Sequence, residues 1–193
     1  MLHTLRYHST NCFFVASARD KRLLALDAGW ACTLREYQRA MKQIGLRYQD
    51  MAWAIVTHFH MDHAGLITDF MADGIQCIVF ENQLHAIDAM EKTIWKNQPD
   101  YRAIDKSKLT QLRVAEAREF FATLGIRGEI LRTDGHSPDS ISFLSDEHEV
   151  VIGDLYPIEA VMPDDEKSNR SWELILAKGG KHIFPSHANA FTV

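Results

Sequence analysis

Short apolar runs alternate along this chain with longer segments of helical period. Residues 11–17 and 22–28 are apolar runs on either side of the charged turn Arg19-Asp20-Lys21, and this pattern predicts a β-hairpin. Other short apolar runs predict strands at residues 52–56, 75–80, 126–131, 141–144, 149–152 and 182–184. The chain is therefore expected to begin with two strands, a helix and a third strand.

Apolar residues at helical spacing predict the helices. Thr33, with Glu36 three residues later, is the expected N-cap of the first helix, and Gly45 is its expected end. Further helices are predicted at residues 66–71, 81–97, 114–124 and 171–178. The polar segments 100–112 and 157–170 are predicted to be loops, the first with room for a short helix.

Four potential metal ligands follow the predicted strand 52–56 within six residues: His58, His60, Asp62 and His63. Because side chains alternate along a strand, His58 and His60 leave its end on one side. Asp62 and His63 are expected at the N-terminus of the next helix, where the helix dipole favours an anionic Asp. A single histidine is often a core or surface residue. Packing gives no reason for this cluster, whereas a divalent metal ion does.

Three more candidate ligands each follow an apolar strand, in loops that contain Gly or Pro: His136, Asp154 and His187. Taken singly, His136 could be a turn residue, Asp154 a helix cap and His187 a surface residue. Their repeated placement after strands, as for the His58 loop, favours one common site.

These motifs make the sequence resemble the metallo-β-lactamase-fold hydrolases. The resemblance rests on Thr57-His58-Phe59-His60-Met61-Asp62-His63, Gly135-His136-Ser137-Pro138, Gly153-Asp154-Leu155 and Pro185-Ser186-His187, which occur in the family's order. It implies an α/β (α+β) fold, a four-layer αββα sandwich of two mixed sheets flanked by helices. Residues 1–193 are expected to form one such domain, a length that can bury its own core.

The resemblance also implies a binuclear metal site. The first ion would be held by His58, His60 and His136, the second by Asp62, His63 and His187, with Asp154 bridging them. Asp27 matches a family position that supports the loop of residues 57–63, here called the metal loop, from behind. The alternative is that Asp27 is an Asp at a strand end without a special role. Imidazoles and carboxylates without a thiolate suit two Zn²⁺ ions, with Mn²⁺ or Fe as alternatives.

The expected activity is hydrolysis of a small ester, lactone or thioester by a metal-bound hydroxide. Asp62 could orient the water or carry its proton, and Asp154 would bridge the metals. Tyr156 is placed like a residue that supports the oxyanion in some lactonases of the family, or it is a buried aromatic. The alternatives are a phosphodiesterase, a mononuclear iron oxygenase acting on persulfides, and a metal-binding sensor. Dedicated β-lactamases generally carry Cys or Ser near the place of Asp154, so antibiotic hydrolysis is not expected.

The composition and charge of the chain restrict which partners and compartments are expected. The net charge of −5 disfavours a nucleic-acid partner. No apolar run approaches the ~18 residues of a membrane helix, and the N-terminus lacks a signal-peptide pattern. Cys12, Cys32 and Cys77 have no paired spacing, which suits a reducing compartment. We therefore expect a cytoplasmic monomer or homodimer that acts on a small molecule.

The substrate pocket is expected near Trp30, residues 95–109 and residues 155–170. Trp95, Tyr101 and Trp172 could line it, or they could be core or loop anchors. Arg102, Lys106 and Lys108 are either a group that receives an anionic substrate or a solvated surface.

Overall fold

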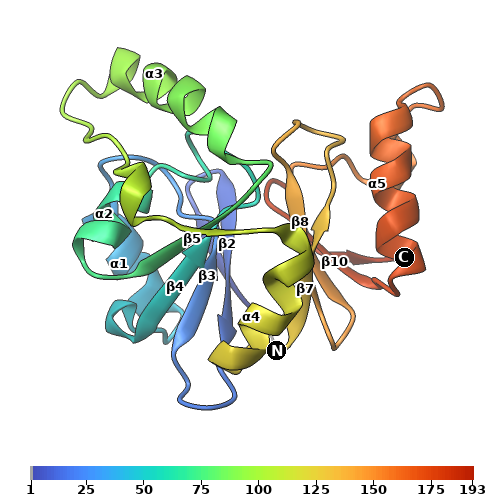
Figure 1. Cartoon of the computed structure of the whole chain (residues 1–193), viewed down its shortest axis with the longest axis horizontal. Helices are drawn as coiled ribbons and strands as arrows, with labels where there is room; N and C mark the ends of the chain where they lie inside the picture. The colour runs from blue at the N-terminus through green and yellow to red at the C-terminus, as the bar shows by residue number, and fades with distance from the viewer. Residues whose placement is uncertain (1) are drawn as a thin grey trace.

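The computed structural model describes residues 2–193 and contains two β-sheets (Figure 1). The six-stranded sheet has the order β1-β2-β3-β4-β5-β6, with bounds β1 (Leu2–Tyr7), β2 (Thr10–Ala16), β3 (Leu23–Leu26), β4 (Met51–Ile55), β5 (Gln76–Phe80) and β6 (Thr110–Leu112). The five-stranded sheet has the order β11-β10-β9-β8-β7, with bounds β7 (Gly128–Arg132), β8 (Ile141–Ser145), β9 (Glu149–Gly153), β10 (His182–Pro185) and β11 (Phe191–Thr192). Both sheets are mixed, since β3–β4 and β9–β10 pair in parallel and β1–β2 and β7–β8 antiparallel.

All but one of the α-helices in the described chain cover the outer faces of the two sheets, and the exception, at Ala117–Leu124, packs against the core between the sheets. The α-helices are α1 (Leu34–Gln43), α2 (Ile67–Ala72), α3 (Ile87–Asn97), α4 (Ala117–Leu124) and α5 (Glu166–Ala177). Short 3₁₀ turns lie at Tyr48–Asp50, Leu84–Ala86, Lys106–Lys108, Val114–Glu116 and Ile158–Ala160. The expected αββα sandwich is confirmed. Within residues 2–193, none of the helices combines the length and hydrophobicity that crossing a membrane requires.

The hydrophobic core has three parts. The central part joins the two sheets, with Phe13 and Ile55 from one, Ile130 and Phe143 from the other, and Phe121 of α4. Because each sheet buries one face against the other sheet and its second face under helices, the central strands are nearly continuous apolar runs.

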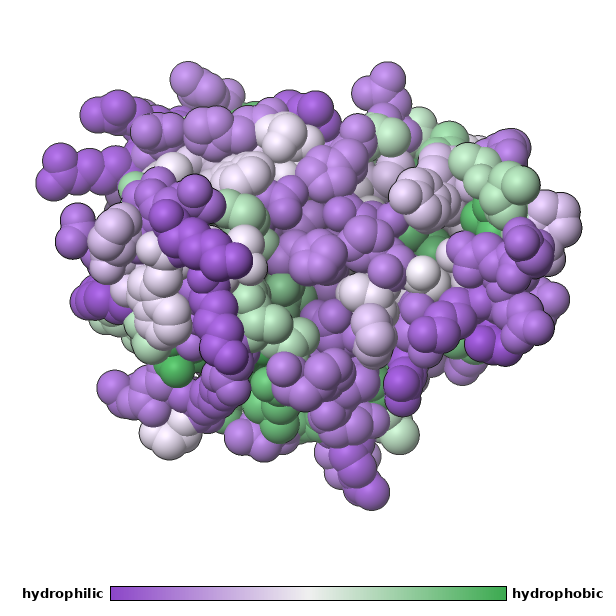
Figure 2. Space-filling view, turned by 90° about the horizontal axis from the view of Figure 1, so that it is seen from above, coloured by the Kyte–Doolittle hydropathy of each residue, from purple (hydrophilic) through white to green (hydrophobic). Residues whose placement is uncertain are grey.

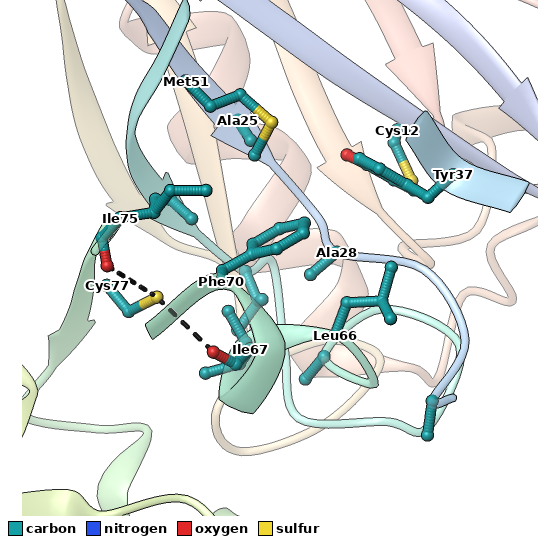
Figure 3. Close-up of a cluster of buried hydrophobic side chains, with 14 of the residues drawn as sticks. Cys12, Ala25, Ala28, Tyr37, Met51, Leu66, Ile67, Phe70, Ile75 and Cys77 are labelled. Carbon is teal, nitrogen blue, oxygen red and sulfur yellow. Dashed lines mark hydrogen bonds between the residues drawn. The ribbon is translucent and has the colours of Figure 1, made fainter. Parts of the chain in front are cut away.

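The second part of the core lies between the six-stranded sheet and α1, α2 and α3, and the third lies under α5. In Figure 3, Phe70 of α2 faces Ala25 and Met51 of the sheet, whereas Ile67 lies beside Cys77. The Cys77 thiol lies 3.8 Å from the carbonyl oxygen of Ile67. The cysteines are free, and Cys12 and Cys77 act as small buried hydrophobic residues.

Several elements differ from the sequence expectations. The strands β1, β6 and β11 were not predicted, because short edge strands become extended through pairing with a neighbour rather than through a pattern of their own. Helix α5 begins at Glu166, earlier than expected, since the Asp165 side chain accepts a hydrogen bond from the Ser168 amide and caps a polar first turn. Thr33 precedes α1 as expected, but its hydroxyl donates to the carbonyl of Trp30 and does not cap.

Topology gathers several loops at one end of the sandwich. β7, β9 and β10 run in the same direction, so the loops that follow them leave the same edge of their sheet. The loop after β4 leaves the other sheet at the same end of the molecule, the upper end in Figure 1. Figure 2 looks onto this end, where hydrophilic side chains occupy much of the centre and hydrophobic ones are exposed between them.

Candidate metal centre

The loop after β4 contributes the first histidines. His58 and His63 are fully buried and His60 is exposed. The ring centroid of His58 lies 4.3 Å from that of His60 and 4.2 Å from that of His63. Such close packing of imidazoles leaves little room for water between them.

The other sheet brings His136, Asp154 and His187 to the same place. His136 follows β7, Asp154 follows β9 and His187 follows β10. His136 Nε2 lies 3.3 Å from His60 Nδ1, so the two sheets meet at this contact. The ring centroids of His187 and His63 are 5.4 Å apart.

The potential ligand atoms fall into two neighbouring groups. Those of His58, His60, His136 and Asp154 lie within 4.8 Å of one another, and so do those of Asp62, His63 and His187. The structure therefore brings together every residue that the sequence motifs selected as a metal ligand.

The Asp154 carboxylate lies between the two groups. Its Oδ1 is 3.3 Å from His63 Nε2 and 3.2 Å from His187 Nε2. Its Oδ2 is 3.7 Å from both His58 Nε2 and His136 Nε2. One oxygen of the carboxylate thus faces each group.

Several buried polar atoms of the centre lack hydrogen bonds. Within the described residues, His58 Nε2, His63 Nε2 and Asp154 Oδ1 are buried without a hydrogen-bond partner. Leaving such atoms unsatisfied is costly, so each calls for an explanation. Lone pairs of imidazoles and carboxylates that converge on one point are the donor set that zinc and similar divalent ions bind. The residues therefore fit a metal site.

The electrostatics of the site keep its ligands in different protonation states. Burial lowers the pKa of His58 well below its ordinary value, and the neighbouring imidazoles lower it further. Burial also lowers the pKa of His136. Neutral imidazoles carry the lone pair that binds a metal.

At His63, nearby carboxylates raise the pKa instead of letting burial lower it. Burial acts to lower the pKa of His63, but Asp27 and Asp154 outweigh it and raise the pKa to about 10. Burial acts to raise the pKa of Asp154, but His63, His187 and His136 outweigh it, so its pKa is lowered and it stays ionised.

Asp27 supports the metal loop from below. Its fully buried carboxylate accepts hydrogen bonds from the Thr57 amide at 2.6 Å and from the Thr57 hydroxyl at 3.0 Å. It also contacts His63 Nδ1 at 2.9 Å and accepts from the Ser186 hydroxyl at 3.2 Å. Asp27 therefore links loops of both sheets and fixes the orientation of His63.

Sequence patterns did not reveal three further contacts. The Thr10 hydroxyl donates to Asp62 Oδ2 at 2.8 Å, and His187 Nδ1 lies 2.9 Å from the Ser9 carbonyl. The Asp139 carboxylate accepts a hydrogen bond from the Phe59 amide at 2.7 Å. These residues orient the ligands from outside, and no motif marks them, because each acts through a contact distant in sequence.

Asp62 and His63 are not at a helix N-terminus, contrary to expectation. Helix α2 begins only at Ile67. The intervening loop is instead held against the β3–α1 connection by the hydrogen bonds Ala28 N–H to His63 O at 2.5 Å and Gly65 N–H to Gly29 O at 2.8 Å. Asp62 is thus held by the Thr10 hydroxyl, without a helix dipole.

Two cavities border the centre. A cavity of about 570 Å³ touches His60 and Asp62, and one of about 220 Å³ touches His136, Asp154 and His187. Tyr156 lines the smaller cavity and is 60% exposed, so it is not a buried aromatic residue. Trp172 lies on α5 itself and is buried against the five-stranded sheet.

The segment 95–109 was expected to line the pocket, but its residues border neither cavity. Trp30 also borders neither of them. The basic residues of the segment pair with nearby acids: Arg102 with Asp69, Lys106 with Asp88 and Lys108 with Asp105. The solvated-surface interpretation of these cations therefore describes them better than a role in anion binding.

Comparisons with known sequences identify a family and relatives of this chain. A family profile described as "Anti-Pycsar protein Apyc1" matches residues 2–176. The lactamase-like protein aptB of Emericella nidulans is 24% identical over 148 residues, which cover 77% of this chain and 40% of that protein. The atrochrysone carboxyl ACP thioesterase of Pseudocercospora fijiensis is 25% identical over 148 residues, or 75% of this chain and 36% of that protein. The matched region is about two fifths of the length of these relatives.

Solved structures share the fold. A metallo-β-lactamase family protein from Thermus thermophilus has a TM-score of 0.71 at 20% identity, covering 99% of this chain and 74% of that chain. The protein TTHA1623 in a di-iron-bound form has a TM-score of 0.70 at 21% identity, covering 100% and 94%. The BLEG-1 B3 metallo-β-lactamase has a TM-score of 0.72 at 17% identity, with the same coverage.

Proposed function

This chain belongs to the family described as anti-Pycsar protein Apyc1 and has the metallo-β-lactamase fold, and on this premise we propose that it is a metal-dependent hydrolase with a binuclear centre. Zn²⁺ is the proposed metal because the donor set is imidazole and carboxylate without thiolate. Fe and Mn²⁺ are the alternatives, and the di-iron form of TTHA1623 supports iron as a competitor.

The proposed ligands of one ion are His58, His60 and His136, and those of the other are Asp62, His63 and His187. Asp154 is proposed to bridge the ions. The single observation that carries this assignment is the Asp154 carboxylate, with one oxygen within 3.3 Å of the second group and the other 3.7 Å from the first.

Two such ions supply a nucleophile near neutral pH by lowering the pKa of bound water, and they stabilise negative charge on the substrate. The chain's own groups do the rest. Asp62, held by the Thr10 hydroxyl, is positioned to accept a proton from the attacking water at its carboxylate. The exposed hydroxyl of Tyr156 is proposed to donate a hydrogen bond to the oxyanion from the smaller cavity.

The proposed substrates are small esters, lactones or thioesters. Water adds its OH to the acyl carbon, the C–O or C–S bond breaks, and a proton goes to the leaving alcohol or thiol. The thioesterase among the matched relatives supports acyl chemistry, although it is the longer protein.

The test combines metal analysis with a substrate panel. Purified protein is reconstituted with Zn²⁺, Fe²⁺ or Mn²⁺, its metal content is measured by elemental analysis, and turnover of chromogenic acyl esters, a thioester and a phosphodiester is compared. We expect two ions per chain and acyl turnover well above that of the phosphodiester.

Variants connect the activity to the centre. His60→Ala and Asp154→Ala are expected to lose bound metal and acyl turnover together, whereas His3→Ala, on the edge strand β1, retains both. Acyl turnover that persists in Asp154→Ala would contradict the proposal. If the phosphodiester turns over faster than the acyl esters, the substrate class would be phosphodiesters instead. One iron per chain would favour the oxygenase alternative.

A further inference from the structure

The larger cavity is a groove that continues from the proposed centre towards α3. It has a volume of about 570 Å³, within the range of roughly 300–1,000 Å³ typical of small-molecule sites. His60 and Asp62 lie at one end of it. A molecule that reacts at the centre therefore has this groove available for its remaining atoms.

One wall of the groove is a face of α3 and the 3₁₀ turn before it. The residues on this wall are Ala86, Ala89, Met90 and Thr93, which are spaced as i, i+3, i+4 and i+7 and so share one helix face. The opposite wall includes Phe59, Met61 and Pro138. Methionine side chains on both walls can adapt to an apolar ligand.

Charged side chains of α3 face elsewhere. Asp88 pairs with Lys106 at 2.6 Å, and the Glu91 carboxylate accepts a hydrogen bond from the Ile104 amide at 2.6 Å. Among the described residues that line the groove, none is Lys or Arg. His85 is the imidazole outside the proposed ligand set, and it is exposed.

This lining selects against an anion away from the reacting bond. An anionic group that enters the groove loses hydration without gaining a cationic partner, which costs free energy. An alkyl chain instead gains about 0.8 kcal/mol per buried CH₂, or about fourfold in binding. Met90 is buried and Met61 is half-buried, so the groove already has apolar surface for such a chain.

We propose that the groove between Met61 and α3 holds an uncharged, apolar acyl chain of the substrate, with the scissile carbonyl at the His60–Asp62 end. This inference rests on the proposed hydrolase function and names its substrate class. Ala89 and Met61 then influence which chains are accepted, because both line the groove.

The first test is a chain-length series of p-nitrophenyl esters, from acetyl to octanoyl, with the metal-loaded protein. We expect kcat/KM to rise with each added methylene by up to about fourfold. The variant Ala89→Trp fills the groove and is expected to lose this rise, so that its octanoyl-to-acetyl ratio of kcat/KM falls towards one. A glutaryl ester, which carries a carboxylate at the far end of its chain, is expected to react more slowly than the pentanoyl ester of similar length.

The matched control is Lys92→Trp, which places the same side chain on an exposed position of α3 outside the groove. It is expected to keep the wild-type chain-length profile. A flat profile in the wild type, or equal losses for acetyl and octanoyl esters in Ala89→Trp, would overturn the proposal.

A binding measurement separates this inference from the proposed function. Octanamide and acetamide are titrated calorimetrically into wild type, Ala89→Trp and Lys92→Trp. Octanamide is expected to bind wild type and Lys92→Trp, and to lose at least about tenfold in affinity to Ala89→Trp. If no ester turns over but octanamide binds in this pattern, the hydrolase proposal is wrong, whereas the assignment of the groove to an apolar chain is supported. If esters turn over but octanamide binds no better than acetamide, the groove assignment is wrong.

Discussion

At the scale of single residues, Asp27 shows how one buried carboxylate organises a metal loop. It has a positive φ of 70° and holds groups from the loops after β4 and β10. Its charge is balanced by His63, whose pKa it helps to raise. The ligands can be preorganised because this contact network does not involve the metal itself.

Asp27→Asn tests this role. Asn tolerates the left-handed backbone conformation, so the substitution mainly removes the charge and one acceptor. We expect metal affinity to fall about 10- to 100-fold, as is typical when an outer hydrogen-bond partner of a ligand is lost. Competition with a chromogenic chelator measures this. Asp20→Asn, in an exposed turn, is the control, and equal affinities in the two variants would contradict the role of Asp27.

Glu91 is a buried carboxyl on α3 whose titration affects stability. Burial raises its pKa, although the Ile104 amide donates to it. Because its pKa in the folded state is above that in the unfolded state, its contribution to stability is greatest below about pH 4.3 and is lost as the pH rises through the folded pKa.

Glu91→Gln keeps an acceptor for the Ile104 amide and removes this titration. We expect the variant to become more stable relative to wild type between about pH 4 and pH 7, so that its free energy of unfolding rises relative to that of wild type. Urea denaturation at both pH values measures the difference. Glu119→Gln, exposed on α4, should show no such trend, and a trend of the opposite sign for Glu91→Gln would refute the argument.

At the scale of elements, the metal loop is held by its contact with the β3–α1 connection. Gly65 permits this contact, since a Cβ atom there would overlap the backbone nitrogen of Ala31 and lie 2.5 Å from the carbonyl carbon of Trp30. The loop must therefore move if any side chain is added.

Gly65→Ala is expected to destabilise the protein by about 3 kcal/mol, because the overlap is with backbone. The metal loop should shift with it, so metal affinity should also fall. Denaturant unfolding and metal titration check both effects. Gly45→Ala is the comparison: its Cβ meets nothing within 4 Å, and its φ of +79° alone costs about 1 kcal/mol.

At the scale of the whole molecule, the proposed centre joins the two sheets. His58, His60, Asp62 and His63 follow β4 of one sheet, and His136, Asp154 and His187 follow strands of the other. Ions bound there would bind the folded chain and not the unfolded one, so they would stabilise the packing of sheet against sheet.

Metal loading is therefore expected to raise the melting temperature. Zinc at a hundred times its dissociation constant contributes about 2.7 kcal/mol. Thermal unfolding with added zinc, and with a chelator, measures this difference. The increase in melting temperature with zinc should vanish in Asp154→Ala and persist in His3→Ala. If zinc does not change the melting temperature of the wild type, this would argue against the binuclear centre.

Much of the architecture and all of the candidate ligands were predictable from sequence, since they are encoded locally. The apolar run before His58 and the alternation of its side chains require no partner to be recognised. In contrast, β1, β6 and β11 become strands by pairing, and the start of α5 depends on one capping Asp. Thr33 kept its position but not its expected bond, because its hydroxyl donates to the Trp30 carbonyl and does not accept from an amide of the first turn.

The sequence by itself thus determined which side chains are candidate metal ligands, because ligand chemistry belongs to residue types and their order after strands. Only the tertiary structure decided how they meet: which oxygen of Asp154 faces which group, that Thr10 and Asp139 orient the loop, and that α3 forms the wall of a groove. These features depend on contacts between segments far apart in the chain, and distances of that kind are fixed by packing, not by local pattern.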